Sequence, residues 1–147
     1  MKNYPKAIFE LKPSIVSKGQ VGLFALKDFD RGEIIVSSDY WDESVLIPWY
    51  EFEEIDPITK NKLIDFCYKT EEGVHAPQNI NKINIAYFFN HSCEPNSFTD
   101  KDGNYIANKN IKIGTEFTID LESLMEKTCT SFECECGSIN CRKIIKI

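Results

Sequence analysis

The chain has 147 residues, of which 42% are hydrophobic and 27% charged, and this length predicts one domain with a core of its own. Its 17 basic and 23 acidic residues leave a net charge of −6. An acidic surface repels phosphate backbones, which argues against nucleic acid as a direct partner. The same charge suits a lysine-rich peptide, although it would also serve solubility alone.

The sequence has no apolar run near the roughly 20 residues that cross a bilayer, so no membrane partner is expected. The first residues also lack the apolar stretch and cleavage site of a secretion signal. We therefore expect a cytoplasmic or nuclear protein. In that reducing setting the six cysteines predict metal binding or reactive thiols rather than disulfides.

The first half of the chain alternates between short extended segments and turns. Apolar and polar residues alternate in 7–16, and the β-branched or apolar runs 21–25, 33–37 and 44–47 predict strands. Residues 52–68 have apolar positions at helical spacing, and Pro57 should divide them into two short pieces.

The second half begins with residues 70–84, whose polar composition predicts an irregular segment. An apolar run follows at 85–89. Short strands are then expected at 105–107 and 116–119, joined by a turn around Gly114. Many short strands, irregular connections and little helix predict a mainly β domain of folded-over sheets.

The tail carries three cysteines in the pattern C-x-C-x4-C, namely Cys134, Cys136 and Cys141. Structural zinc takes four thiolate or imidazole ligands, and Gly137 allows a tight turn between those of one loop. The spacing therefore predicts a zinc site and leaves its fourth ligand open. The candidates are Cys93, Cys129, Cys67, His91 or a group from another molecule.

The central stretch FFNHSCEPN runs from Phe88 to Asn96 and changes abruptly from aromatic to small polar residues. Two phenylalanines belong in a core, whereas the residues after them are typical of an exposed turn. The spacing alone leaves His91 open as a metal ligand, a core histidine or a ligand contact.

These stretches together resemble the SET-domain family, whose members are lysine methyltransferases that use S-adenosylmethionine. FFNHSCEPN is similar to the family's central motif, and the tail resembles its post-SET zinc motif. Residues 18–25 with Arg-Gly-Glu at 31–33 resemble its opening glycine pattern, and residues 113–121 resemble G-E-E-L-T-[YF]-D-Y. The order and approximate spacing agree from about residue 14 to 143.

The resemblance implies a β-clip-like SET fold in which the central motif passes beneath a loop near the C-terminus, forming a pseudoknot. Residues 1–127 would form the SET domain, with a short central insert at about 41–84 that shapes substrate choice. Residues 128–147 would form the post-SET zinc-binding tail.

The resemblance also implies two ligands, S-adenosylmethionine and Zn²⁺. Gly22 would allow close approach of the methyl donor, although a bulge glycine is the alternative, and Tyr87 is equally compatible with a core position. The implied donor-binding residues are Gln20, Gly22, Leu23, Tyr87, Asn90 and His91. The implied zinc ligands are Cys93, Cys134, Cys136 and Cys141.

The implied activity is transfer of a methyl group to a lysine side chain of a protein or peptide, by a protein expected to be a monomer. Leu121 occupies the position of the family's usual channel tyrosine, and Ile119 an aromatic position. The substitute hydroxyl would come from Tyr40, Tyr87 or Tyr105. The alternatives are binding of the donor or a peptide without transfer, another acceptor, or a zinc-stabilised interaction domain that binds no donor.

Overall fold

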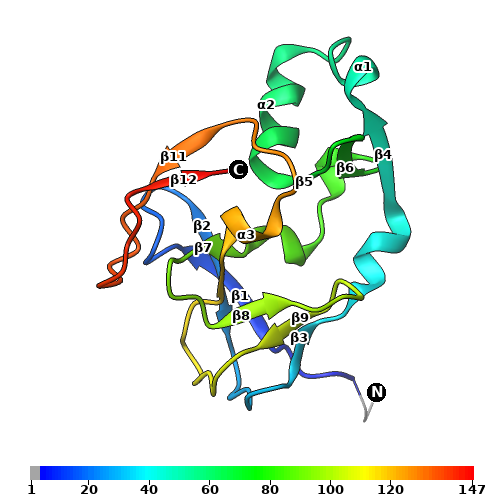
Figure 1. The fold of residues 1–147 in the computed structure, drawn as a ribbon. Helices are drawn as coiled ribbons and strands as arrows, with labels where there is room; N and C mark the ends of the chain where they lie inside the picture. Colours follow the sequence, from blue (N-terminus) through cyan, green and yellow to red (C-terminus); the bar gives the residue numbers. More distant parts are fainter. Residues whose placement is uncertain (1–3) are drawn as a thin grey trace.

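The computed structural model describes residues 4–147 and contains five small sheets in that range (Figure 1). The strands are short because the β-branched and aromatic runs that form them are short and lie between turns. The strands are β1 (Phe9–Pro13), β2 (Val21–Ala25), β3 (Ile34–Val36), β4 (Ser44–Pro48), β5 (Tyr68–Lys69), β6 (Gly73–Pro77), β7 (Asn90–His91), β8 (Ser97–Thr99), β9 (Tyr105–Ala107), β10 (Thr118–Ile119), β11 (Ser131–Glu133) and β12 (Ile144–Lys146). The helices are α1 (Trp49–Phe52), α2 (Pro57–Phe66) and α3 (Leu121–Leu124), with 3₁₀ turns η1 (Ser38–Glu43), η2 (Ile80–Lys82) and η3 (Ile85–Phe88).

The central core lies between the β1–β2 hairpin and the antiparallel sheet β3–β9–β8. Phe29 and Phe117 meet edge to face at 5.2 Å between ring centroids, and Phe89 stacks on Tyr105 at 4.2 Å. Such aromatic packing removes a large apolar area from water and supplies most of the stability of a small β domain.

The insert, residues 41–84, has a sheet and an apolar cluster of its own. Strand β6 pairs with β4 on one side and β5 on the other, and Figure 1 shows α1 and α2 beside this sheet, far from β3–β9–β8. Pro57 opens α2, and Asp56 caps it by accepting from the N–H groups of Ile58 and Thr59. The buried cluster consists of Phe52, Leu63, Cys67, Val74 and Ala76.

The tail, residues 128–147, forms the antiparallel hairpin β11–β12 and returns the C-terminus toward the insert (Figure 1). Its buried cluster is small and comprises Cys134, Ile145 and Ile147.

The central motif is held by a clasp of hydrogen bonds to the segment around β10. Strands β7 and β10 pair in parallel, with Asn90 opposite Thr118. Asn96 donates its amide to the Glu116 carbonyl at 2.8 Å and accepts from the Thr118 N–H at 2.9 Å. Ser97 donates to the Thr118 carbonyl at 2.5 Å. The polar motif is therefore satisfied inside the protein rather than by water.

The mainly β prediction with few short helices is confirmed, as is a helix that begins at Pro57. The other helical piece lies earlier than predicted, at Trp49–Phe52 instead of between residue 52 and Pro57. The turn at Gly114 is also present, with a φ of 85° that favours glycine. The prediction of an irregular 70–84 is wrong in part, because β6 occupies residues 73–77 between two partner strands. In the described part of the chain, no helix has the length and apolar character needed to cross a membrane.

Candidate functional site

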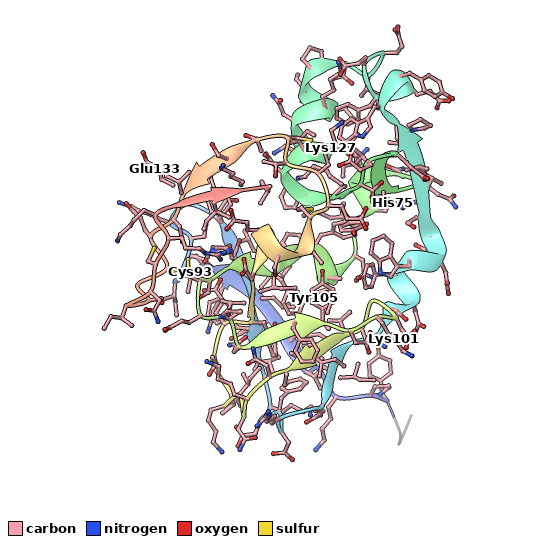
Figure 2. All side chains as sticks on the ribbon, in the orientation of Figure 1. His75, Cys93, Lys101, Tyr105, Lys127 and Glu133 are labelled. Carbon is pink, nitrogen blue, oxygen red and sulfur yellow. The ribbon has the colours of Figure 1, made fainter. Side chains whose placement is uncertain are left out.

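A cavity of about 890 Å³ lies at the junction of the central core, the insert and the tail. Figure 2 shows Lys101 at the lower right, Tyr105 near the centre and Glu133 at the upper left, and all three contribute to the lining of the cavity. A cavity of this volume accommodates a nucleotide-sized ligand or a side chain with its flanking peptide.

Most of the residues that the sequence singled out line this cavity. The exceptions are the cysteines, which form a separate cluster, and Gly22 and Leu23. The Leu23 side chain is fully buried, because this part of β2 packs into the central core. The singled-out residues in the lining are Gln20, Tyr40, Tyr87, Asn90, His91, Tyr105, Ile119 and Leu121.

Two of the three candidate tyrosines are held inside the protein. The Tyr40 hydroxyl donates to the Gly103 carbonyl at 3.1 Å, and the buried Tyr105 packs against Tyr40 with 5.9 Å between ring centroids. Burial raises the pKa of Tyr40 to about 12 and raises that of Tyr105 well above its ordinary value. Both phenols are therefore protonated at neutral pH.

Tyr87 differs from the other two. Its ring meets that of Tyr40 edge to face at 6.3 Å, and burial raises its pKa as well. Within residues 4–147 no hydrogen bond joins its hydroxyl to another group, and the half-buried side chain lines the cavity. Tyr87 is consequently the candidate whose hydroxyl remains available to a ligand.

Ile119 and Leu121 contribute an apolar wall next to these tyrosines. Ile119 is buried on β10, and Leu121 begins α3 and packs against both the central core and the tail cluster. An apolar wall facing aromatic rings excludes water, which favours the neutral form of an amine that enters.

The Asn90 side chain is engaged inside the protein. Its amide donates to the Val21 carbonyl at 2.9 Å and to the Glu116 carboxylate at 3.1 Å. The side chain thus joins β7 to the start of β2, and Asn90 also forms part of the cavity lining.

His91 connects the cavity wall to the cysteine cluster. Its Nδ1 accepts from the Leu121 N–H at 3.2 Å, so the neutral ring carries its proton on Nε2. Nε2 lies 3.3 Å from the Cys93 sulfur and donates to it. Burial lowers the His91 pKa, against the opposing charge of Asp120 at 3.6 Å.

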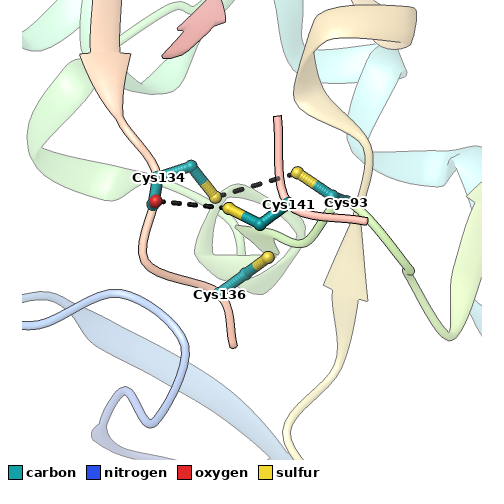
Figure 3. Close-up of side chains that lie close together, drawn as sticks. All are labelled: Cys93, Cys134, Cys136 and Cys141. Atoms are coloured by element: carbon teal, nitrogen blue, oxygen red, sulfur yellow. Dashed lines mark hydrogen bonds between the residues drawn. The ribbon is translucent and has the colours of Figure 1, made fainter. Parts of the chain in front are cut away.

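Four cysteines meet behind this wall (Figure 3). The Sγ atoms of Cys93, Cys134, Cys136 and Cys141 all lie within 4.8 Å of one another, with Cys93 and Cys134 at 3.9 Å. Zinc–sulfur bonds of about 2.3 Å in a tetrahedron place sulfurs about 3.8 Å apart. The four sulfurs therefore fit a structural zinc ion, and Cys67 and Cys129 lie outside the cluster.

The cluster already favours a thiolate. Burial opposes ionisation of Cys136, yet N–H groups of Cys93 and Ser138 bond to its sulfur and lower its pKa to about 6. Burial raises the pKa of Cys134 to about 12, so the first negative charge resides on Cys136. The positive charge of a bound zinc ion would favour the thiolate form of the remaining cysteines, as zinc binding requires.

Arg142, which follows the last cysteine, connects the tail to the residues just after β10. Its guanidinium donates to Asp120 at 2.7 Å and to Glu122 at 2.6 Å, and its backbone N–H donates to the Cys93 sulfur at 3.3 Å. The hydrogen bond to Asp120 raises the Arg142 pKa. Arg142 thus connects the cysteine cluster to the segment that contains Leu121 of the cavity wall.

Sequence reasoning assigned no role to Arg142 or to Glu116, although both belong to quoted motifs. Glu116 is 5% exposed and accepts hydrogen bonds from several segments. A carboxylate within an apolar strand pattern is the signal that would have identified it, because buried carboxylates need partners.

Comparison of the sequence with known proteins identifies a family and several relatives. Residues 20–121 match the SET domain family. Histone-lysine N-methyltransferase trr of Drosophila melanogaster is 28% identical over 130 residues, covering 84% of this chain and 5% of that protein. ASHH2 of Arabidopsis thaliana is 29% identical (84% of this chain, 7% of that protein), and human SETD2 is 31% identical (82% and 5%). The last two are also histone-lysine N-methyltransferases, and the chain spans only 5 to 7% of the length of these relatives.

Proposed function

Because the chain belongs to the SET-domain family, we propose that it transfers a methyl group from S-adenosylmethionine to a lysine of a protein substrate. The observation that carries the proposal is the cavity, which combines the Asn90–His91 strand with protonated tyrosines and an apolar wall. Residues 1–127 would form the catalytic domain with the insert at 41–84, and residues 128–147 the zinc-binding tail, in a nuclear or cytoplasmic setting.

In this proposal the donor supplies an electrophilic methyl group on a sulfonium sulfur. The lysine nitrogen forms the new C–N bond as the C–S bond breaks, and the amine loses its proton to solvent before attack. Ile119 and Leu121 favour the neutral amine by excluding water, and Tyr87 accepts or donates a hydrogen bond that aligns the nitrogen.

The four cysteines would hold zinc without taking part in the transfer. The closed set of four sulfurs leaves no open position for a substrate, which is typical of a structural ion. Zinc would keep the tail against His91 and Leu121, so that the cavity retains its wall.

The test is methyl transfer by zinc-loaded protein to a panel of lysine peptides, followed by mass spectrometry. Wild type should add methyl groups to lysine, and Tyr87→Phe should lower kcat about tenfold or more, as loss of a hydrogen bond to a charged or charging group does. Tyr50→Phe, on the exposed tyrosine of α1, is the matched control and should leave kcat unchanged. Equal rates for Tyr87→Phe and wild type would remove Tyr87 from the proposal.

The second candidate function is a module that binds the donor or a methylated peptide without transfer, and Leu121 favours it. Members of the family usually have a tyrosine there. Leu121→Tyr should raise transfer if the cavity is otherwise competent. A wild type that binds the donor but stays inactive on every peptide, with no gain from Leu121→Tyr, would support the binding module.

A further inference from the structure

The buried Glu116 carboxylate joins two segments that line the cavity from different parts of the chain. Oε1 accepts from the Ser14 hydroxyl at 2.7 Å and from the Asn90 amide at 3.1 Å. Oε2 accepts from the N–H groups of Ile15 at 2.7 Å and Val16 at 3.3 Å. Four donors thus converge on one side chain.

The loop that Glu116 holds, residues 14–20, also has hydrogen bonds within itself, among them one from the Gln20 N–H to the Ser17 carbonyl at 3.1 Å. The Ser14 N–H donates to the Gln20 carbonyl at 2.9 Å, and the Ser17 N–H donates to the Ser14 hydroxyl at 2.9 Å. Ser17, Lys18 and Gln20 then line the cavity. Val16 and Ser17 are half-buried, and the hydrogen bonds that join residues 14–16 to the buried protein all end on Glu116, which is therefore the loop's main anchor.

Gly22 leaves the space that this carboxylate needs. A Cβ at position 22 would lie 2.4 Å from the Glu116 Oε1, which no real side chain tolerates without movement. The same region carries the Asn90 amide, which bonds to both the Val21 carbonyl and Glu116. The glycine therefore reflects packing around an internal carboxylate.

We propose that Glu116 is a positioning residue for the methyl donor, acting through the loop 14–20 and Asn90 rather than by touching the donor. This inference rests on the proposed function. A site whose two walls come from segments about 70 residues apart binds well only if both are held in place beforehand, because ordering a loop on binding costs affinity. Glu116 holds both walls through one carboxylate.

Glu116→Gln is the first test, because the amide keeps the size of the side chain but replaces one acceptor oxygen by a donor. Titration calorimetry with S-adenosylmethionine should show at least tenfold weaker binding. Hydrogen exchange of residues 14–20 without donor should become faster, while the zinc content stays at one per chain. Glu33→Gln is the matched control, since that carboxylate also accepts from a backbone N–H, at Asp30, but neither bonds to the loop nor lines the cavity.

Ser14→Ala is the milder variant in case Glu116→Gln fails to fold. It removes one hydroxyl that bridges the loop to Glu116, and should weaken donor binding about threefold and speed exchange in the same residues. Ser37→Ala, on an exposed serine that bonds to Asp39, should do neither.

The outcomes separate this inference from the proposed function. Unchanged donor affinity and unchanged exchange in folded Glu116→Gln, or in Ser14→Ala should Glu116→Gln not fold, would overturn the positioning role while the methyltransferase proposal stands. A wild type that binds no donor would overturn the proposed function. Exchange needs no donor, so faster exchange in the variants would still show that Glu116 holds the loop.

Discussion

The insert, residues 41–84, and the tail, residues 128–147, both contribute to the cavity but differ in how they are held. The insert contributes Phe66 and Tyr68 and has its own apolar cluster around Leu63 and Val74. The tail contributes Phe132 and Ile147, and its buried cluster consists of only Cys134, Ile145 and Ile147.

This difference indicates two sources of order within one small domain. A segment with a helix, a sheet and several buried apolar side chains can hold its shape by burial alone. A segment of about twenty residues with few buried apolar side chains usually needs a metal or disulfides. We therefore expect the tail, and not the insert, to depend on zinc.

The largest expected effect comes from Cys136→Ser, which removes the cluster's most acidic thiol. Zinc binding supplies about 10–16 kcal/mol in small zinc domains, so its loss should unfold the tail and abolish detectable donor binding. Metal content and hydrogen exchange measure the change, and the insert should keep its protection. Cys129→Ser, on the exposed cysteine outside the cluster, is the control. A tail that stays protected without metal would contradict the comparison.

Leu63→Ala should destabilise the insert while the tail keeps its zinc. Leu63 is 3% exposed, and loss of a buried leucine costs about 2–5 kcal/mol because a cavity remains. Urea denaturation should show this loss with one zinc still bound per chain. Ile58→Ala, at an exposed position of the same helix, should change the free energy of unfolding by less than about 0.5 kcal/mol. Zinc release by Leu63→Ala would show that the two regions are not independent.

A third effect concerns pH and the buried Lys69, whose Nζ donates to the Ile64 carbonyl at 2.7 Å. Burial lowers its pKa from the ordinary 10.5, so above the folded pKa the unfolded chain holds a proton that the folded protein has released. The free energy of unfolding should therefore rise with pH from the folded pKa toward 10.5, by at most about 1.4 kcal/mol per pH unit.

Urea denaturation between pH 7 and 9.5 measures this rise. Lys69→Met should remove the rise, because methionine fills the same space without a charge, whereas Lys109→Met on an exposed lysine should retain it. An identical pH profile for wild type and Lys69→Met would show that Lys69 stays protonated throughout the range.

The smallest effect concerns a contact between the insert and the segment that leads into the tail. The Lys127 ammonium lies 4.4 Å from the centre of the Trp49 ring (Figure 2 labels Lys127). Such a cation–π contact contributes about 0.5–1 kcal/mol at a partly exposed site. Lys127→Gln should lower the free energy of unfolding by that amount, and Lys109→Gln should not. A larger loss would mean that the insert and tail stabilise each other more than their separate clusters indicate.

Local patterns were sufficient for several features of this protein. The spacing of Cys134, Cys136 and Cys141 indicated a metal site, and Pro57 marked the division between two helices. Strands β2 and β9 have the predicted bounds, because their apolar runs are flanked by clear turns. In each case neighbours in the sequence are also neighbours in space.

Other features were missed because their partners are distant in the chain. Strand β6 contains a histidine and ends in a proline, and only pairing with β4 and β5 makes it a strand. The hairpin β11–β12 lies within a cysteine-rich tail whose residues show little alternation.

The amino-acid sequence was enough to establish the kind of chemistry at hand, namely soft sulfur ligands, a polar central motif and a position where leucine replaces tyrosine. The family resemblance already implied Cys93 as the fourth ligand, and the tertiary structure places its sulfur beside those of the tail cysteines. Only the tertiary structure identified Tyr87 as the available hydroxyl and Glu116 as the link between two cavity walls. The physical reason is that local spacing determines which groups the chain offers, whereas packing of distant segments determines which of those groups meet.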